Sequence, residues 1–300
     1  MSLEFCVLGS GSSGNATVVR APSGAFLIDA GFGPRTTEKR LHGTGVALKD
    51  IAAIVLTHLD SDHFNPYWLR TILKQRIRVH LSARCVKDFL KIPEVRDMEQ
   101  GLFAKPIADG SAASIHELLA PFEDSLEPLP RVQMRALPLA HDETGSHGFH
   151  ITCSDIRAGF ATDLGHVPPH LIEAFLGVDF LALESNYDPL MEETSDRPYY
   201  LKQRIMGGQG HLSNEQALAA IQQILDRTHA EIGPEKLPRH IVLLHRSRQC
   251  NCPNIVRRLF SQDPRIKPIL TLTDQFERTP WLRARQPREP VATQLAMAWA

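Results

Sequence analysis

The residues most able to do chemistry lie in "THLDSDH", residues 57–63, directly behind an apolar run. Two imidazoles and two carboxylates at positions i, i+2, i+4 and i+5 of a loop can be turned toward one point. They are His58, Asp60, Asp62 and His63. Burying two carboxylates together without a cation would cost several kcal/mol or force proton uptake. The spacing therefore predicts a metal site; the simpler alternative is a solvated loop whose aspartate caps the next helix.

A glycine-rich loop, "GSGSSG" at residues 9–14, fits the G-x-G-x-x-G pattern of dinucleotide-binding proteins. That motif requires a helix at its third glycine, where the helix N-terminus receives a pyrophosphate. The residues that follow, 15–31, are β-branched and interrupted by Pro-Ser-Gly, which is typical of a hairpin. The nucleotide interpretation is thus disfavoured. A tight turn and a backbone cradle for a substrate phosphate, assisted by Ser12 or Asn15, both stay open.

These loops must be positioned by two groups of apolar strands with helices between them, an order that predicts a layered α/β sandwich. One helix is well marked, because Ser213 and Gln216 form a capping box before an amphipathic run. The expected strands are 3–9, 15–21, 24–31, 50–58, 131–141, 148–155, 156–163, 179–185 and 240–246. The expected helices lie within 65–75, 82–92, 168–177 and 211–225.

Composition places the chain among folded globular proteins, with 300 residues, 43% hydrophobic and 22% charged. We expect one domain, residues 1–278, followed by a proline-containing surface tail, residues 279–300. No export signal or membrane-spanning run is recognisable, so a cytoplasmic location and no membrane partner are expected. The net charge of −1 gives no nucleic-acid footprint by itself, which weakens a nuclease hypothesis without excluding it. Five scattered cysteines indicate reduced thiols, and the Cys250/Cys252 pair alone makes a poor zinc site.

Several stretches resemble a known family. "LIDAG" (27–31) and "THLDSDH" are similar to the first two signatures of the metallo-β-lactamase superfamily, and "SGSSGN" (10–15) and "ESNYD" (184–188) resemble its YycJ/WalJ-type exonuclease branch. Residues 199–217 and 243–254 extend the likeness, which runs to about residue 275. The resemblance implies a four-layer αββα sandwich, α/β (α+β) in class, with a two-metal hydrolytic site.

The same resemblance implies a ligand set and a mechanism. One ion would be held by His58, Asp60, His141 and Asp163, and a second by Asp62, His63, His245 and the same Asp163. One or two divalent ions are expected, zinc, manganese or iron, and the water between them would be acidic enough to act as the nucleophile. The expected catalytic residues are Asp62 and His211, and the expected substrate contacts are Ser12, Asn15, Asn186 and His211. Asp29 either orients a ligating histidine or caps a strand-end turn.

Two residues depart from the family pattern. Asp60 stands where the superfamily usually has its second histidine, and Tyr187 stands where the YycJ pattern reads "ESNHD". Three hypotheses therefore remain: a phosphodiester hydrolase with nucleic acid as a candidate substrate, a hydrolase of a cyclic phosphodiester, thioester or lactone, and a binding protein with a decayed metal site. A basic track would favour nucleic acid, and its candidates are Lys202, Arg204, Arg246 and Arg248. The oligomeric state stays open.

Overall fold

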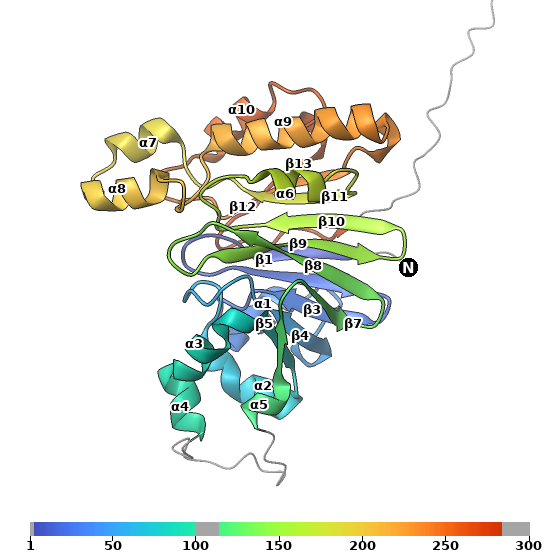
Figure 1. Cartoon of the computed structure of the whole chain (residues 1–300), viewed down its shortest axis with the longest axis vertical. Helices are drawn as coiled ribbons and strands as arrows, with labels where there is room; N and C mark the ends of the chain where they lie inside the picture. The colour runs from blue at the N-terminus through green and yellow to red at the C-terminus, as the bar shows by residue number, and fades with distance from the viewer. Residues whose placement is uncertain (1–2, 100–113, 284–300) are drawn as a thin grey trace, which may run out of the picture.

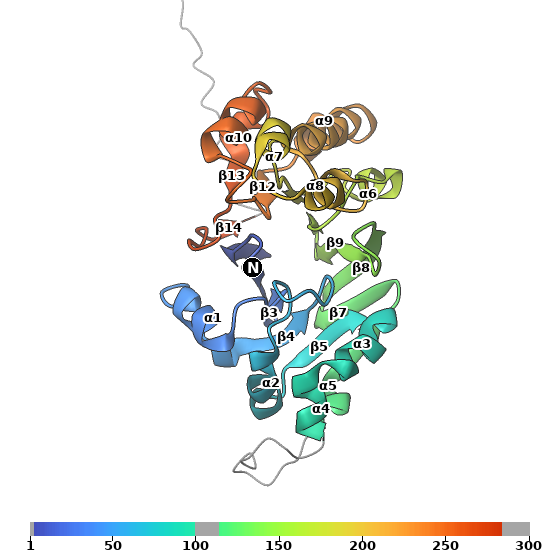
Figure 2. The same ribbon diagram turned by 90° about the vertical axis from the view of Figure 1, so that its left-hand side faces the viewer.

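The computed structural model describes residues 3–99 and 114–283. Two seven-stranded sheets pack face to face, and helices cover both outer surfaces (Figures 1 and 2). The predicted αββα sandwich is confirmed.

The first sheet has the order β14-β1-β2-β3-β4-β5-β6. Its strands are β1 (Glu4–Gly9), β2 (Ala16–Ala21), β3 (Gly24–Ile28), β4 (Ile51–Val55), β5 (Arg78–Ser82), β6 (Leu119–Phe122) and β14 (Leu282–Arg283). β14 pairs with β1, with Leu282 opposite Phe5. Leu282 and Arg283, which the sequence analysis assigned to the tail, therefore lie in this sheet, and Thr279 donates its backbone N–H to the carbonyl of Val7. The part of the predicted tail after Arg283 lies outside the described residues.

The second sheet has the order β13-β12-β11-β10-β9-β8-β7. Its strands are β7 (Ser125–Leu129), β8 (Val132–Leu139), β9 (Ser146–Cys153), β10 (Ile156–Ala161), β11 (Phe180–Glu184), β12 (His240–Leu244) and β13 (Leu270–Leu272). β10 to β13 are parallel, so their carboxyl ends share one edge of the sheet. That edge carries a large part of the site described below.

Helices α1 to α5 lie on the outer side of the first sheet, and α6, α9 and α10 on that of the second (Figure 1). Their bounds are α1 (Pro34–Leu41), α2 (Leu69–Gln75), α3 (Val86–Lys91), α4 (Pro93–Glu99), α5 (Ile115–Leu118), α6 (Pro169–Ala174), α7 (Pro189–Thr194), α8 (Tyr199–Met206), α9 (Asn214–Glu231) and α10 (Pro253–Phe260). The predicted capping box of Ser213 and Gln216 is confirmed at the start of α9. No helix in the described ranges has the length and apolar character needed to cross a bilayer.

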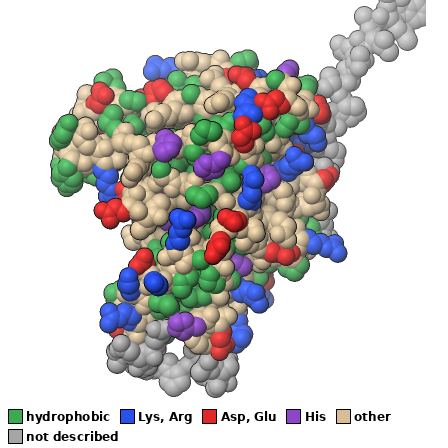
Figure 3. Space-filling view, viewed as in Figure 1, with side chains coloured by type: hydrophobic (Ala, Val, Ile, Leu, Met, Phe, Trp, Pro, Cys, Tyr) green, Lys and Arg blue, Asp and Glu red, His purple; other side chains and the backbone are tan. Residues whose placement is uncertain are grey.

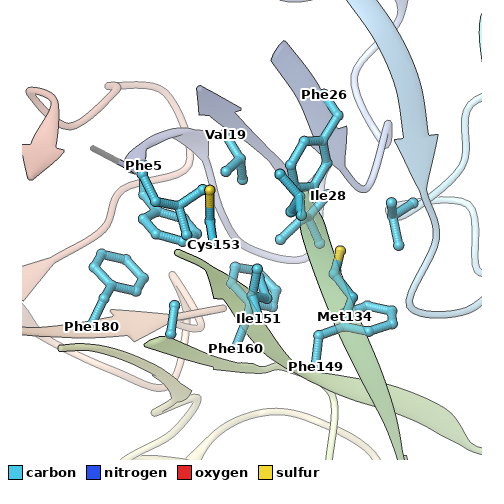
Figure 4. Packing of buried hydrophobic residues seen from close by; sticks show 14 of the residues in the cluster. Phe5, Val19, Phe26, Ile28, Met134, Phe149, Ile151, Cys153, Phe160 and Phe180 are labelled. Atoms are coloured by element: carbon cyan, nitrogen blue, oxygen red, sulfur yellow. The ribbon is translucent and has the colours of Figure 1, made fainter. Parts of the chain in front are cut away.

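The core between the sheets is apolar and closely packed (Figure 4). Phe5 of β1 stacks on Phe180 of β11, with ring centroids 4.1 Å apart. Met134 and Phe149, on neighbouring strands of the second sheet, are also fully or almost fully buried in this layer. Because apolar packing of this kind resists deformation, the strand ends that carry polar residues are fixed relative to one another.

Candidate metal centre

The polar residues predicted to bind metal all follow strands and meet at one edge of the sandwich. The loop after β4 supplies four of them, and the loops after β8, β10 and β12 supply His141, Asp163 and His245. Two of these residues have a positive φ, 55° at Asp163 and 51° at His245. Non-glycine residues rarely adopt this left-handed conformation, and where they do it often serves to aim a functional side chain.

Asp163 is the centre of the arrangement and is only 2% exposed. Its Oδ2 lies 3.0 Å from Nε2 of His63, and its Oδ1 lies 3.0 Å from Nδ1 of His245. Nε2 of His141 is 3.9 Å from the same Oδ1. One carboxylate thus faces histidines from both sheets, the position that a bridging ligand requires.

The ligand atoms fall into two groups on either side of this carboxylate. Candidate donor atoms of His58, His141 and Asp163 lie within 4.8 Å of one another, as do those of Asp62, His63 and His245. Compared with the predicted ligand sets, the first group lacks Asp60 and the second lacks Asp163, although Asp163 lies 3.0 Å from His63 and from His245.

Asp60 lies at the outer side of the first group. Its side chain is 46% exposed, and its Oδ2 is 3.6 Å from Nε2 of His58 and 3.9 Å from Nε2 of His141. The carboxylate therefore faces Nε2 of both histidines from the solvent side.

The residues present fit a divalent cation. Nε2 of His58 is buried and has no hydrogen-bond partner among the described residues. A buried nitrogen without a partner is costly, and a cation between His58, His141 and Asp163 would satisfy it. The mixture of imidazole nitrogens and carboxylate oxygens is that of zinc, manganese and iron sites.

The charges at the site are balanced by contacts between carboxylates and imidazoles. Burial by itself would raise the pKa of Asp62, but His245 and His63 outweigh it and hold that pKa at about 2. Burial would likewise raise the pKa of Asp163, yet the same histidines hold it well below its usual range. Burial opposes protonation of His63, but Asp163 and Asp29 raise its pKa well above the ordinary value. A pocket that stabilises positive charge this strongly is suited to a cation.

Asp29 orients a ligand. Its Oδ2 lies 2.8 Å from Nδ1 of His63, and its Oδ1 accepts hydrogen bonds from the backbone N–H and the hydroxyl of Thr57. The first contact leaves Nε2 of His63 free to face Asp163. Both roles considered for Asp29 are therefore present, since it holds a histidine and fixes the start of the metal loop.

Glu184 is a member of the site that the sequence analysis missed. It ends β11, is fully buried, and its Oε1 lies 2.7 Å from Nδ1 of His211 and 3.3 Å from Nδ1 of His245. Burial would lower the pKa of His211, but Glu184 outweighs burial and raises it. The available signal was its place at the end of an apolar strand, a position that the candidate metal ligands share.

His211 and Ser12 remain open to solvent, whereas the two predicted asparagines do not. The His211 side chain is 20% exposed, and Ser12 lies on an exposed loop. Asn15 is buried, with its Nδ2 3.3 Å from Oδ2 of Asp62. Asn186 is buried and donates to the backbone carbonyl of His245 at 2.7 Å. Both amides contact candidate ligand residues, and their predicted substrate contacts stay predictions.

The glycine-rich loop leads into β2, a strand, so the nucleotide-binding helix is absent from this position, as predicted. Its Ser10 hydroxyl accepts the backbone N–H of His245 at 2.8 Å and donates to Oδ1 of Asn15 at 2.9 Å. The loop therefore ties the two halves of the site together.

Tyr187 does not replace an imidazole at the site. It is 3% exposed and packs with Ile205 and Cys250 in a small apolar cluster. Burial raises its pKa to about 12, so the phenol stays neutral.

Three of the four residues proposed for a basic track are already engaged. Lys202 donates to backbone carbonyls, Arg204 pairs with Asp142, and Arg246 pairs with Asp274. On the face shown in Figure 3, acidic and basic side chains are interspersed rather than gathered in a band. The described residues on this face therefore form no continuous basic track.

A strand-end centre of histidines and aspartates on an αββα sandwich is the arrangement of a metal-dependent hydrolase. The family described as "Beta-lactamase superfamily domain" matches residues 25–241, and the chain belongs to the metallo-β-lactamase superfamily. The resemblance noted in the sequence is confirmed.

Two named relatives are similar to this chain over most of its length. The chain is 25% identical to "Exodeoxyribonuclease YycJ" of Bacillus anthracis over 263 residues, which cover 87% of this chain and 89% of the relative. It is 25% identical over 229 residues to "Exodeoxyribonuclease WalJ" of Streptococcus pneumoniae, covering 76% and 79%. Among solved structures, the metallo-β-lactamase fold protein YhfI of Bacillus subtilis has a TM-score of 0.62 at 12% identity and covers 93% of this chain and 100% of its own. That last likeness concerns the fold alone.

Proposed function

We propose that this protein is a metal-dependent phosphodiesterase that cleaves nucleic acid. The observation that carries the proposal is the joint placement of Asp163 between two ligand groups and of His211 beside them, with Nδ1 of His211 3.5 Å from Oδ1 of Asp163. The names of the two relatives that match most of the chain, both exodeoxyribonucleases, support this substrate class.

The residues that would hold the ions are His58, His141 and Asp163 on one side, with Asp60 at its outer edge, and Asp62, His63 and His245 on the other. Bound divalent ions supply positive charge that polarises a phosphodiester and makes water more acidic. Because its pKa is about 2, Asp62 is a carboxylate throughout the neutral range and cannot serve as an acid.

The proton donor is His211. Glu184 raises the pKa of the imidazole and holds its Nδ1. Its side chain reaches a cavity of about 330 Å³ that His141 and Arg204 also line. His211 can therefore hold a proton at Nε2 and release it to the departing oxygen of a nucleotide, a step for which general acids typically contribute about 10²- to 10⁴-fold in rate.

The test uses the manganese- or zinc-loaded protein, with elemental analysis to count the ions, for which one or two per chain are expected. Substrates are single- and double-stranded DNA, RNA, bis(p-nitrophenyl) phosphate, a thioester and a lactone. We expect His211→Gln to lower kcat on DNA by about 10²- to 10⁴-fold, but to lower it much less on bis(p-nitrophenyl) phosphate, whose leaving group needs no proton.

The matched control is His229→Gln, because His229 is an exposed histidine on α9. It should leave both activities unchanged. Metal-loaded protein that is inactive on every phosphodiester would refute the proposal, and turnover of the thioester or lactone instead would identify a small-molecule hydrolase.

A further inference from the structure

Exposed aromatic side chains occur on segments that adjoin the candidate ligands in the chain or in the sheets. Among residues 3–99 and 114–283, the large aromatic side chains that are more than half exposed are Tyr67, Tyr199, Tyr200 and Phe276. Tyr67 follows the metal loop, and α8, which carries two of them, ends shortly before His211. Exposed aromatic rings near a site are useful to a ligand that has flat faces of its own.

Phe276 lies in a segment that is fixed by several hydrogen bonds. It follows β13, whose parallel neighbour β12 ends beside His245, so both segments emerge at the same edge. Its backbone N–H donates to Oδ1 of Asp274 at 2.8 Å. The preceding Gln275 is 2% exposed; its side chain accepts the N–H of Ser13 at 2.9 Å and donates to the carbonyl of Gly14 at 2.8 Å. The backbone is thus fixed to the loop that leads to Asn15, while the ring stays 58% exposed.

Arg248 lies against this ring, with the guanidinium carbon 4.7 Å from the centroid of Phe276. It stands three residues after His245, on the loop whose Ser247 N–H donates to the carbonyl of Asn186 at 2.8 Å. Unlike Arg204 and Arg246, Arg248 makes no ion pair with a carboxylate within the described residues. Its charge is therefore available to an anion.

We propose that Phe276 and Arg248 form a subsite for one unpaired nucleotide next to the metal centre, with the base stacked on the ring and the phosphate held by the guanidinium. This inference rests on the proposed function. Aromatic platforms combined with arginine are the means by which proteins hold single strands without reading their sequence. A base inside a duplex has both faces covered, so the subsite selects a single strand or a frayed end.

The test measures binding of fluorescent single strands of about a dozen nucleotides to the metal-loaded protein. Phosphorothioate linkages resist cleavage, and an abasic strand of equal length keeps the charge but removes the bases. Phe276→Ala should weaken binding of the normal strand by about 5- to 150-fold and leave the abasic strand unchanged. Phe276→Trp should retain the affinity. Arg248→Ala should weaken both strands and lower the salt dependence of binding by about one phosphate contact.

The controls are Ile232→Ala and Arg258→Ala, which remove an exposed apolar side chain and an exposed charge elsewhere on the surface. Both should bind like the parent protein. The subsite is overturned if Phe276→Ala binds the normal strand as tightly as the parent does, or if it loses affinity equally for normal and abasic strands. It is also overturned if the parent protein binds no strand. Turnover of bis(p-nitrophenyl) phosphate and of DNA tests the proposed phosphodiesterase function separately from the subsite. If both activities remain while the binding results fail, only the subsite is wrong.

Discussion

Replacing Asp29 with asparagine should release metal without unfolding the protein. Asp29 is 1% exposed and accepts hydrogen bonds from the backbone and hydroxyl of Thr57 while facing Nδ1 of His63 at 2.8 Å. An asparagine of the same shape would keep its oxygen toward the buried N–H of Thr57. Its amide group would then point at Nδ1 of His63 as a donor, which drives the imidazole proton to Nε2. Nε2 is the nitrogen that faces Asp163, so a proton there competes directly with the metal.

The size of the effect follows from the number of ligands disturbed. Only His63 changes tautomer, and the other candidate ligands keep their contacts. Loss of such an orienting carboxylate typically lowers metal affinity by about 10- to 100-fold, or about 1.4 to 2.7 kcal/mol. The ion near Asp62, His63 and His245 should bear this loss, while the ion near His58 and His141 should keep most of its affinity.

The measurement is a competition titration with a chromophoric chelator, which resolves the affinity of each ion, alongside thermal unfolding in EDTA. The matched control is Asp50→Asn, because Asp50 is an exposed aspartate that accepts the backbone N–H of Ala47 away from the site. Asp29 does not orient His63 for metal binding if Asp29→Asn holds both ions as tightly as the parent protein, or if Asp50→Asn loses metal equally.

Two further substitutions have expected outcomes. Asp60→His should tighten zinc binding at the His58 and His141 group, because an imidazole reaches further than the half-exposed carboxylate; an unchanged affinity in the same chelator titration would show that Asp60 is not a weak ligand. Burial lowers the pKa of His80 to about 4, below the 6.5 of the unfolded chain, so its stabilising effect is full above pH 6.5 and is lost as pH falls toward 4. Between pH 7 and pH 5, the free energy of unfolding in urea should therefore fall by about 2 kcal/mol less in His80→Gln than in the parent. An equal fall in both proteins would contradict the lowered pKa of His80.

The sequence was most informative where a segment is buried on both faces. β4 and β11 were predicted because they are short and apolar, apart from the terminal Glu184 of β11, and the structure buries nearly every residue in them. β5 and α1 were not predicted. "RVHLS" is only five residues with an arginine and a histidine, and "PRTTEKRL" is mostly polar, so neither carries a strong periodic signal. Both are stabilised by contacts with distant segments, which a single sequence does not reveal.

The candidate ligands were predictable because each follows an apolar strand within a recognisable motif. The roles of the polar residues behind them were not. The contact of Asn15 with Asp62 was not foreseen and Glu184 was overlooked, since the sequence does not tell which side of a loop a side chain faces. Their contacts with Asp62 and His211 join loops of the same half of the sandwich that lie 47 and 27 residues apart in the chain.

The two departures from the family pattern bear differently on whether the site has decayed. Tyr187 is packed in an apolar cluster, so its side chain contributes to folding and not to the metal groups. Asp60 still directs a carboxylate at His58 and His141, at the solvent side. A site that had lost its function would have no reason to keep buried polar groups aligned, because each is costly unless partnered. Here Asp29 still contacts His63, and Glu184 still contacts His211, so the network that orients the candidate ligands is intact. This favours an active centre in which Asp60 changes the affinity for the ion at the His58 and His141 group.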